Sequence, residues 1–274
     1  FSFILQYVFI KKQYIPIIQN LGQKKRFFCV KTPYIIGKRY NKGMSRYTDG
    51  NYLLQNPGWH AQDARWKLAH VLRAVKAARL SPHSVLDAGC GAGALINHWA
   101  RHNPEMHFTG CDISPQAISL AKQHAPENVN FLCEAWADGT FDVALAIDVV
   151  EHVPDMERFL SELAQKAPVL ILHVPLDLSF RTLIKPEILE EEYQTVGHIH
   201  FFTARYLKRL LKKRGWQILH AHYTNKYVER PPQLTGLKSR IGMCIRLLAH
   251  YLLPRNWAAF WVGGYSLMLA VRTK

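Results

Sequence analysis

The segment Val85-Leu86-Asp87-Ala88-Gly89-Cys90-Gly91-Ala92-Gly93 constrains the fold more than any other part of the chain. An apolar run ends in an acid, glycines follow at every second position, and a helical pattern begins at once. Glycines let the backbone turn sharply and pass close beneath a ligand, and Asp87 at the strand tip suits a positively charged amino group. A dinucleotide-binding loop has the spacing G-x-G-x-x-G, whereas the third glycine here comes one residue early. The segment predicts a strand, a ligand-binding turn and a helix, and a turn with a purely structural role is the alternative.

Short apolar runs alternate with helical patterns around this segment. The helix predicted over 61–80 carries Trp66, Ala69, Leu72 and Val75 at helical spacing, and Ser114 before Pro115 is a good helix start. Further helices are predicted at 93–102, 115–124 and 155–166, and from Thr203 to Gly215. Strands are predicted at Ser84–Asp87, His107–Cys111, Val129–Leu132, Phe141–Ala146, Val169–Val174, Trp216–Tyr223 and Gly264–Val271. This alternation predicts a doubly wound α/β fold: five parallel strands, then a strand pair joined through a basic helical insertion at 230–258.

Charge divides the chain into three parts. Residues 1–43 hold nine Lys/Arg and no acid, residues 44–202 have a balance of −7, and residues 203–274 have a balance of +13. A basic C-terminal quarter predicts an anionic partner, such as a phosphate-bearing substrate, a membrane surface or nucleic acid. A solvated basic helix face is the alternative.

The first 43 residues differ from the rest in composition. They show no sustained helical or strand period, and their mostly apolar opening of ten residues is about half of what crosses a bilayer. We expect Met44 to be the natural start, with 1–43 a non-native or disordered extension and 44–274 the folded domain. A membrane-touching extension is the alternative. The five cysteines lie far apart, which indicates neither a disulfide framework nor a metal site and favours a cytoplasmic protein.

Two further acids follow predicted strands. Asp112 ends the second strand about twenty residues after the glycines, where a carboxylate can accept both hydroxyls of a ribose. Glu134, just past the third strand, is a candidate partner for an adenine amino group, or is merely solvated. Both positions favour a nucleoside ligand.

The segment from Phe141 to Asp155, which ends in Glu151-His152-Val153-Pro154-Asp155, resembles the class I S-adenosylmethionine-dependent methyltransferases. The resemblance covers roughly residues 59–225 and returns at Gly263-Gly264-Tyr265-Ser266-Leu267. It implies a seven-stranded, mostly parallel Rossmann-like sheet and S-adenosylmethionine as cofactor. It places cofactor contacts at Asp87, Gly89, Gly91, Gly93, Asp112, Ala146, Ile147 and Asp148. Together with Ala88, Ile113 and Glu134, these are the predicted cofactor-binding residues.

A narrower resemblance is to uncharacterised bacterial methyltransferases, at residues 56–60 and 197–202 and at the Gly263 segment. It names no substrate. The chain has Ala146-Ile147-Asp148-Val149 where methyltransferases of adenine or glutamine amino groups carry Asn/Asp-Pro-Pro-aromatic. The resemblance therefore argues against that type of amine chemistry.

Histidines are the candidates for catalysis. Methyl transfer from a sulfonium is an in-line displacement, and a hydroxyl acceptor gains from a nearby base. His152 follows the fourth strand, and His198 and His200 lie in a loop expected to fold over the strand ends. We predict His152 or His198 as the base; a structural or substrate-contacting role is the alternative.

Two other functions are compatible with a nucleoside-binding fold: a nicotinamide oxidoreductase and a non-catalytic binding module. The glycine spacing and Asp87 disfavour the first, and the intact cofactor motifs disfavour the second. The basic C-terminal part and its aromatics Tyr251, Trp257, Phe260 and Trp261 predict a small-molecule, glycan or lipid-linked acceptor, with peripheral membrane contact. The chain shows no recognisable RNA-binding module, so nucleic acid is not the expected partner.

Overall fold

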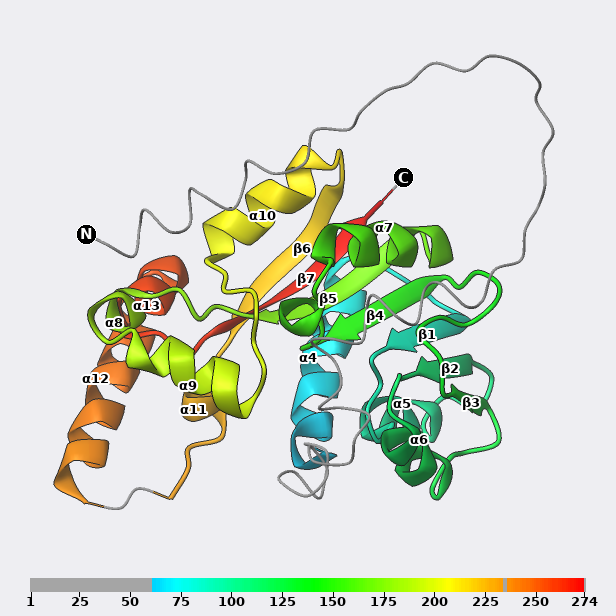
Figure 1. Ribbon diagram of the computed structural model, residues 1–274, viewed down its shortest axis with the longest axis horizontal. Helices are drawn as coiled ribbons and strands as arrows, with labels where there is room; N and C mark the ends of the chain where they lie inside the picture. The colour runs from blue at the N-terminus through cyan, green and yellow to red at the C-terminus, as the bar shows by residue number, and fades with distance from the viewer. Residues whose placement is uncertain (1–60, 234–235, 274) are drawn as a thin grey trace, which may run out of the picture. The chain divides into compact units, whose positions relative to one another are not determined.

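The structure is a computed structural model that describes residues 61–233 and 236–273 (Figure 1). The predicted extension at 1–43 and the segment 56–60 lie outside the described residues.

Seven strands form one sheet in the order β3-β2-β1-β4-β5-β7-β6. Strands β1 to β5 run parallel, and β7 pairs antiparallel with both β5 and β6. The seven strands are β1 (Ser84–Ala88), β2 (His107–Cys111), β3 (Val129–Leu132), β4 (Val143–Ile147), β5 (Val169–Pro175), β6 (Gln217–Thr224) and β7 (Ser266–Arg272). The predicted fold class is confirmed, and each strand lies within two residues of its predicted ends.

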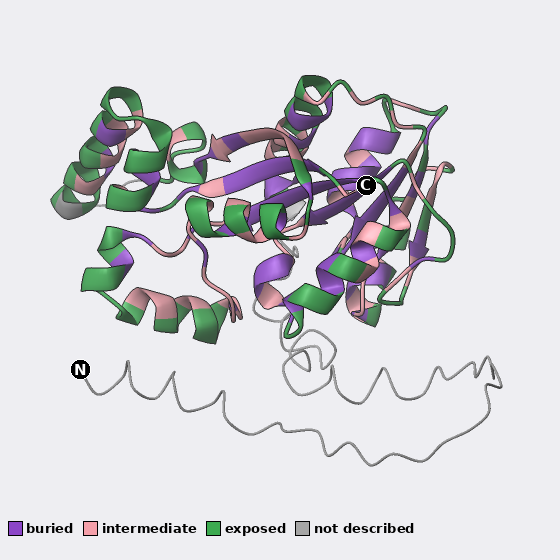
Figure 2. Ribbon diagram, turned by 90° about the horizontal axis from the view of Figure 1, so that it is seen from above, coloured by how far each residue is buried: buried purple, intermediate pink, exposed green. Residues whose placement is uncertain are grey.

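Successive strand residues face opposite sides of the sheet and build two apolar cores. Leu86, Ala144 and Leu170 pack on one face, whereas Val85 and Val143 pack on the other. Helices α4 (Ala64–Ala77), α5 (Ala94–Ala100) and α6 (Pro115–Lys122) contribute to the second core, and α7 (Met156–Lys166) and α10 (Ala204–Lys213) contribute to the first. Figure 2 shows the buried strands between helices whose outer faces are exposed. A core on each face makes the sheet doubly wound.

The cap at Ser114 is confirmed, because its hydroxyl accepts a hydrogen bond from the amide of Ala117 at 3.3 Å. The predicted apolar face of the first helix is partly wrong. Ala69 and Leu72 are exposed, while Ala64, Val71 and Ala74 are buried with Val75. The segment is helical as predicted, but the face of α4 that packs on the sheet is rotated about the helix axis from the predicted face.

The region after β5 and the insertion together form a helical group, at the left of Figure 1. It consists of α8 (Phe180–Ile184), α9 (Glu187–Thr195), α11 (Lys226–Glu229), α12 (Leu237–Leu252) and α13 (Arg255–Val262). Helices α8 and α9 were not predicted, because α8 is one short turn and α9 buries no residue, so neither leaves a clear apolar period. Within the described part of the chain, none of the helices has both the length and the apolar character needed to cross a bilayer.

Candidate functional site

The sheet order brings the predicted cofactor residues to one edge. Strand β1 pairs with β2 on one side and β4 on the other, all parallel, so the carboxyl ends of the three strands lie side by side. Asp87 is the penultimate residue of β1, Asp112 directly follows β2, and Asp148 directly follows β4. Open α/β sheets bind ligands at this edge, where the strand order reverses.

Two features require glycine in the glycine loop: the backbone conformation and the close packing of neighbouring side chains. Gly89 and Gly93 have φ angles of 77° and 70°, which side-chain-bearing residues rarely adopt. A Cβ on Gly93 would lie 2.4 Å from Cζ of Phe131, and a Cβ on Gly89 would lie 2.6 Å from a methyl of Val149. These two positions therefore accept only glycine without movement of neighbouring groups.

Asp112 holds the loop in place. Its Oδ2 accepts a hydrogen bond from the amide of Gly91 at 2.9 Å, and its Oδ1 accepts one from the amide of Ser114 at 2.9 Å. Burial raises the pKa of Asp112, while these backbone donors oppose the shift. These two hydrogen bonds thus fix the orientation of the carboxylate at the predicted ribose position.

Asp87 is 3% exposed at the end of β1. Burial and the negative charge of Asp112 raise the pKa of Asp87 to about 7, against an opposing effect of Lys67. A positive ligand group beside it would favour the ionised form. The residue therefore fits the predicted role of binding an amino group.

The other predicted cofactor residues differ in exposure. Ala88 and Ala146 have side chains buried in the core, so only their backbone can face a ligand. Ile113 and Ile147 are half-buried at the strand ends, and Glu134 is exposed after β3. All five lie at the carboxyl edge of the sheet, as predicted.

Asp148 is held by contacts that sequence reasoning missed. Its carboxylate lies 2.7 Å from Nζ of Lys67 and 2.5 Å from Nδ1 of His173, whose Nε2 lies 2.9 Å from the hydroxyl of Thr224. Although burial acts in the opposite direction, His173 and Lys67 hold the pKa of Asp148 well below its usual range. Asp148 has a φ of 56°, so these contacts hold an uncommon backbone conformation at the end of β4. No local pattern links residues 67, 148, 173 and 224, which meet only because α4, β4, β5 and β6 pack together.

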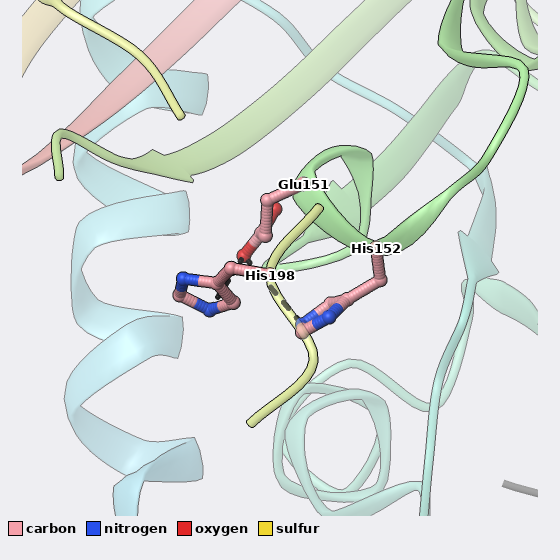
Figure 3. A group of neighbouring side chains, drawn as sticks. All are labelled: Glu151, His152 and His198. Carbon is pink, nitrogen blue, oxygen red and sulfur yellow. Dashed lines mark ion pairs between the residues drawn. The ribbon is translucent and has the colours of Figure 1, made fainter. Parts of the chain in front are cut away.

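The two predicted catalytic histidines lie together beside Glu151 (Figure 3). The rings of His152 and His198 are 4.9 Å apart between centroids, with an interplanar angle of 64°. Glu151 is fully buried, and its Oε1 lies 3.9 Å from Nε2 of His152 and 4.0 Å from Nε2 of His198. Burial and the negative charge of Asp148 raise the pKa of Glu151 well above its ordinary value.

The loop that carries His198 is fastened to Glu151. The amides of Ile199 and His200 donate hydrogen bonds to the carbonyl oxygen of Glu151 at 2.9 and 3.1 Å. Nε2 of His200 is 2.9 Å from the carbonyl oxygen of Val153, which is a structural contact. The loop therefore folds over the strand ends as predicted, with His198 turned toward Glu151.

Asp177, which sequence reasoning also missed, orients His198. Its Oδ2 lies 2.9 Å from Nδ1 of His198. Burial lowers the pKa of His198, but the hydrogen bond and charge of Asp177, together with Glu192, raise it above its ordinary value overall. An imidazole oriented by a carboxylate is suited to accept a proton from a hydroxyl.

A cleft of about 710 Å³ lies next to α10 and α13. Its basic lining comes from Arg205, Lys208, Arg209 and Lys212 on α10, and its apolar lining includes Leu176, Leu178 and Phe260. Asp177, between the two leucines in the chain, contacts His198. The segment 176–178 thus links the cleft to the histidine pair.

Comparisons with known proteins identify the family of the chain. A family model described as "Methyltransferase domain" matches residues 59–221, more than half of the chain. Ajmaline N-methyltransferase of Rauvolfia serpentina is 34% identical over 113 residues, covering 36% of this chain and 38% of that protein. A ubiquinone biosynthesis O-methyltransferase of Coxiella burnetii is 36% identical over 88 residues, covering 29% and 37%. The chain spans less than two fifths of the length of these two relatives.

A solved structure supports the fold. The plantazolicin methyltransferase BpumL, in complex with a monoazolic desmethylPZN analog and S-adenosylhomocysteine, has a TM-score of 0.55. The two chains are 14% identical, and the match covers 86% of this chain and 96% of that one. At this identity the likeness supports the fold alone.

Proposed function

Since this chain belongs to the methyltransferase-domain family, we propose that it transfers a methyl group from S-adenosylmethionine to a hydroxyl of an amphiphilic, anionic acceptor. The observation that carries the cofactor assignment is the meeting of the glycine loop, Asp87 and Asp112 at one sheet edge. A protein of the same fold was solved with S-adenosylhomocysteine, which supports the same ligand here. The residues present fit this ligand, because a buried carboxylate (Asp87) and a half-buried one (Asp112) lie beside the glycine loop at the same sheet edge, suited to an amino group and to ribose hydroxyls.

Each side chain at the edge has a proposed role. Asp87 binds the amino group of the methionine moiety, and Asp112 accepts hydrogen bonds from the ribose hydroxyls. Glu134 accepts a hydrogen bond from the adenine amino group. The backbone at Ala88 and Ala146 and the half-buried Ile113 and Ile147 line the same edge. Asp148 positions the end of β4 through Lys67 and His173. The cofactor supplies the electrophilic methyl group; these residues orient it.

The histidine pair acts on the acceptor. His152 and His198 lie beyond the end of β4, where the acceptor hydroxyl would meet the methyl group. Loss of the hydroxyl proton makes the oxygen a better nucleophile for an in-line displacement. Asp177 supports this role because it orients His198 and stabilises its positively charged form.

The helical group supports an amphiphilic acceptor. Helices α12 and α13 expose large apolar side chains, including Leu248 (59%), Leu252 (74%) and Trp257 (57%). Exposed apolar surface beside basic residues is typical of proteins that contact anionic membranes. We propose that this group covers a small-molecule, glycan or lipid-linked acceptor and touches a membrane surface, with the basic cleft receiving anionic groups.

Calorimetry separates this proposal from the alternative functions. We expect S-adenosylhomocysteine to bind with micromolar affinity or better and NADH not to bind; the reverse would refute the methyltransferase assignment and favour the oxidoreductase alternative. Extracts of cells that lack the protein are then incubated with methyl-labelled S-adenosylmethionine. We expect label in the organic-soluble fraction; label in nucleic acid would contradict the acceptor class, and cofactor binding without any transfer would indicate a binding module.

Vesicle sedimentation tests the membrane contact. The variant Leu252→Asp/Trp257→Asp should lose most of its binding to anionic vesicles while keeping its affinity for S-adenosylhomocysteine. Leu72→Asp is the matched control, because Leu72 is an exposed apolar residue (41%) on α4. Binding should also fall as salt rises, since exposed charges are screened over about 10 Å at 0.1 M. Equal binding by both variants would contradict the contact.

A further inference from the structure

Three potential metal ligands converge at the carboxyl edge of β4. One carboxylate oxygen of Glu151 and one ring nitrogen each of His152 and His198 all lie within 4.8 Å of one another (Figure 3). A metal ion with bonds of about 2.0–2.2 Å separates its neighbouring ligand atoms by about 3–3.5 Å. The distances of 3.9 and 4.0 Å from Glu151 Oε1 to the two Nε2 atoms are only slightly larger. Inward movements below about 1 Å would bring all three atoms into coordination distance.

Hydrogen bonds set the tautomer of both imidazoles. Nδ1 of His152 lies 3.0 Å from the carbonyl oxygen of Gly197, which can only accept, so Nδ1 carries the proton. Nδ1 of His198 likewise donates to the carboxylate of Asp177. In each neutral ring the nitrogen lone pair is therefore on Nε2, and this atom faces Glu151 in both His152 and His198. A histidine whose other nitrogen donates to a carbonyl or a carboxylate is the usual arrangement of a metal ligand.

Glu151 provides an independent observation. Its side chain is 0% exposed, and among the described residues neither carboxylate oxygen has a hydrogen-bond partner. A buried carboxyl group without partners is costly, and buried charges are normally paired or bound to a metal. A cation between Glu151 and the two imidazoles would satisfy the carboxylate without rearranging the backbone around it.

We propose that Glu151, His152 and His198 bind a divalent transition-metal ion, with Asp177 and the carbonyl of Gly197 orienting the two imidazoles. Two imidazole nitrogens and one carboxylate oxygen suit Zn²⁺ or Fe²⁺ better than Mg²⁺ or Ca²⁺, which prefer oxygen ligands. Sequence reasoning predicted no metal site, because the three ligands do not follow a known spacing. The pair Glu151-His152 is contiguous, but His198 reaches it only through the folded loop at 197–200.

The role of the ion rests on the proposed function. Three protein ligands leave at least one coordination position for the acceptor oxygen, and coordination lowers the pKa of that hydroxyl. The hydroxyl proton is released to solvent, and the oxygen lone pair forms the bond to the methyl carbon. The carbon–sulfur bond breaks with its electron pair on sulfur, which leaves neutral S-adenosylhomocysteine. With the ion bound, the imidazoles activate the hydroxyl through the metal rather than as free bases.

Metal binding by the full chain tests the site without requiring an acceptor. Protein stripped with a chelator is titrated with Co²⁺, followed by visible absorption, and with Zn²⁺ by calorimetry. We expect one high-affinity site, with Zn²⁺ affinity at least about 100-fold lower in His198→Ala and Glu151→Gln. Asp177→Ala should weaken binding by about 10- to 100-fold. His200→Ala is the matched control, because His200 lies on the same loop but contacts Val153 instead, and it should bind as the parent does.

The same samples show whether each variant is folded. Every variant is melted and titrated with S-adenosylhomocysteine, whose binding does not use these side chains. Glu151→Gln keeps the shape of the buried side chain and serves if His198→Ala unfolds. No stoichiometric metal binding by the parent, or equal binding by folded His198→Ala and Glu151→Gln, would overturn the metal site. Metal binding without S-adenosylhomocysteine binding would leave the metal site standing and refute the proposed function.

Discussion

The two halves of the candidate site are built in different ways. In the glycine-loop region, residues 85–114, the polar contacts run from backbone amides to one side chain: Asp112 accepts hydrogen bonds from the amides of Gly91, 21 residues earlier, and of Ser114. In the histidine region, residues 148–200, the contacts run between the side chains of several segments: His198 contacts Asp177 and Glu151, and Asp148 contacts Lys67 and His173. The first region is specified by one strand–turn–helix and its neighbouring strand. The second exists only after β4, β5 and the following loop have packed together.

This difference predicts that the two regions can be damaged separately. Backbone donors and glycine conformations position the glycine loop, so its variants should affect cofactor binding and stability. Side chains position the histidine region, so its variants should affect metal binding and methyl transfer. The following predictions test that separation.

The largest effect is expected from Gly93→Ala. Gly93 has a positive φ, and an added Cβ would lie 2.4 Å from Phe131. Left-handed conformation costs about 1–2 kcal/mol and overpacking about 1–3 kcal/mol, so we expect a loss of about 2–5 kcal/mol in unfolding free energy. Gly139→Ala is the matched control, because Gly139 also has a positive φ but a Cβ there would meet nothing within 4 Å. Urea unfolding measures the unfolding free energy of both variants. Equal losses in Gly93→Ala and Gly139→Ala would show that Phe131 moves aside at little cost.

Asp112→Ala should weaken S-adenosylhomocysteine binding by roughly 10- to 150-fold, because a carboxylate that accepts hydrogen bonds contributes about 1.5–3 kcal/mol. Calorimetry should show no comparable loss for Asp138→Ala, an exposed acid in the loop after β3. Co²⁺ binding should be unchanged in both variants. A parallel loss of Co²⁺ binding in Asp112→Ala would mean that the two regions are not separable.

Asp87 should make cofactor affinity depend on pH. Its pKa is raised to about 7, so below this pH the unliganded protein holds a proton that a cationic group must displace. We expect the affinity for S-adenosylhomocysteine to fall roughly tenfold from about pH 7.5 to about pH 6. Calorimetry on Asp87→Asn provides the comparison: it should bind weakly at both pH values. A parent protein with flat affinity over this range would argue against an amino-group contact at Asp87.

The smallest effect is expected from Glu134→Ala. Glu134 is exposed after β3, and one exposed hydrogen bond contributes at the low end of about 0.5–1.5 kcal/mol. The affinity for S-adenosylhomocysteine should therefore fall about two- to threefold. An unchanged affinity would show that Glu134 is only solvated. A loss above about tenfold would show that the ligand buries Glu134. The cofactor site would then extend beyond the glycine-loop region to β3, the outermost strand of the sheet.

Local physics explains what could be predicted from the sequence. Strand positions followed from short apolar runs, and the turn at Gly89–Gly93 followed from glycine spacing, because each depends on residues close together in the chain. The structure agrees with these predictions and with the position of Asp87 and Asp112 at one edge. The histidines could be named as candidates because they follow a strand end or lie in the loop at 197–202.

Tertiary structure decided the rest. It selected Val71 and Ala74 rather than Ala69 and Leu72 for burial, because the orientation of α4 on the sheet depends on its partners. It brought Lys67, His173 and Thr224 to Asp148, and Asp177 to His198, through strand order and loop path. The sequence by itself predicted the glycine-loop half of the candidate site, because one strand–turn–helix and its neighbouring strand supply its residues. Tertiary structure alone decided which partners the predicted histidines contact, since contacts between distant segments form only when the strands, helices and loops pack together.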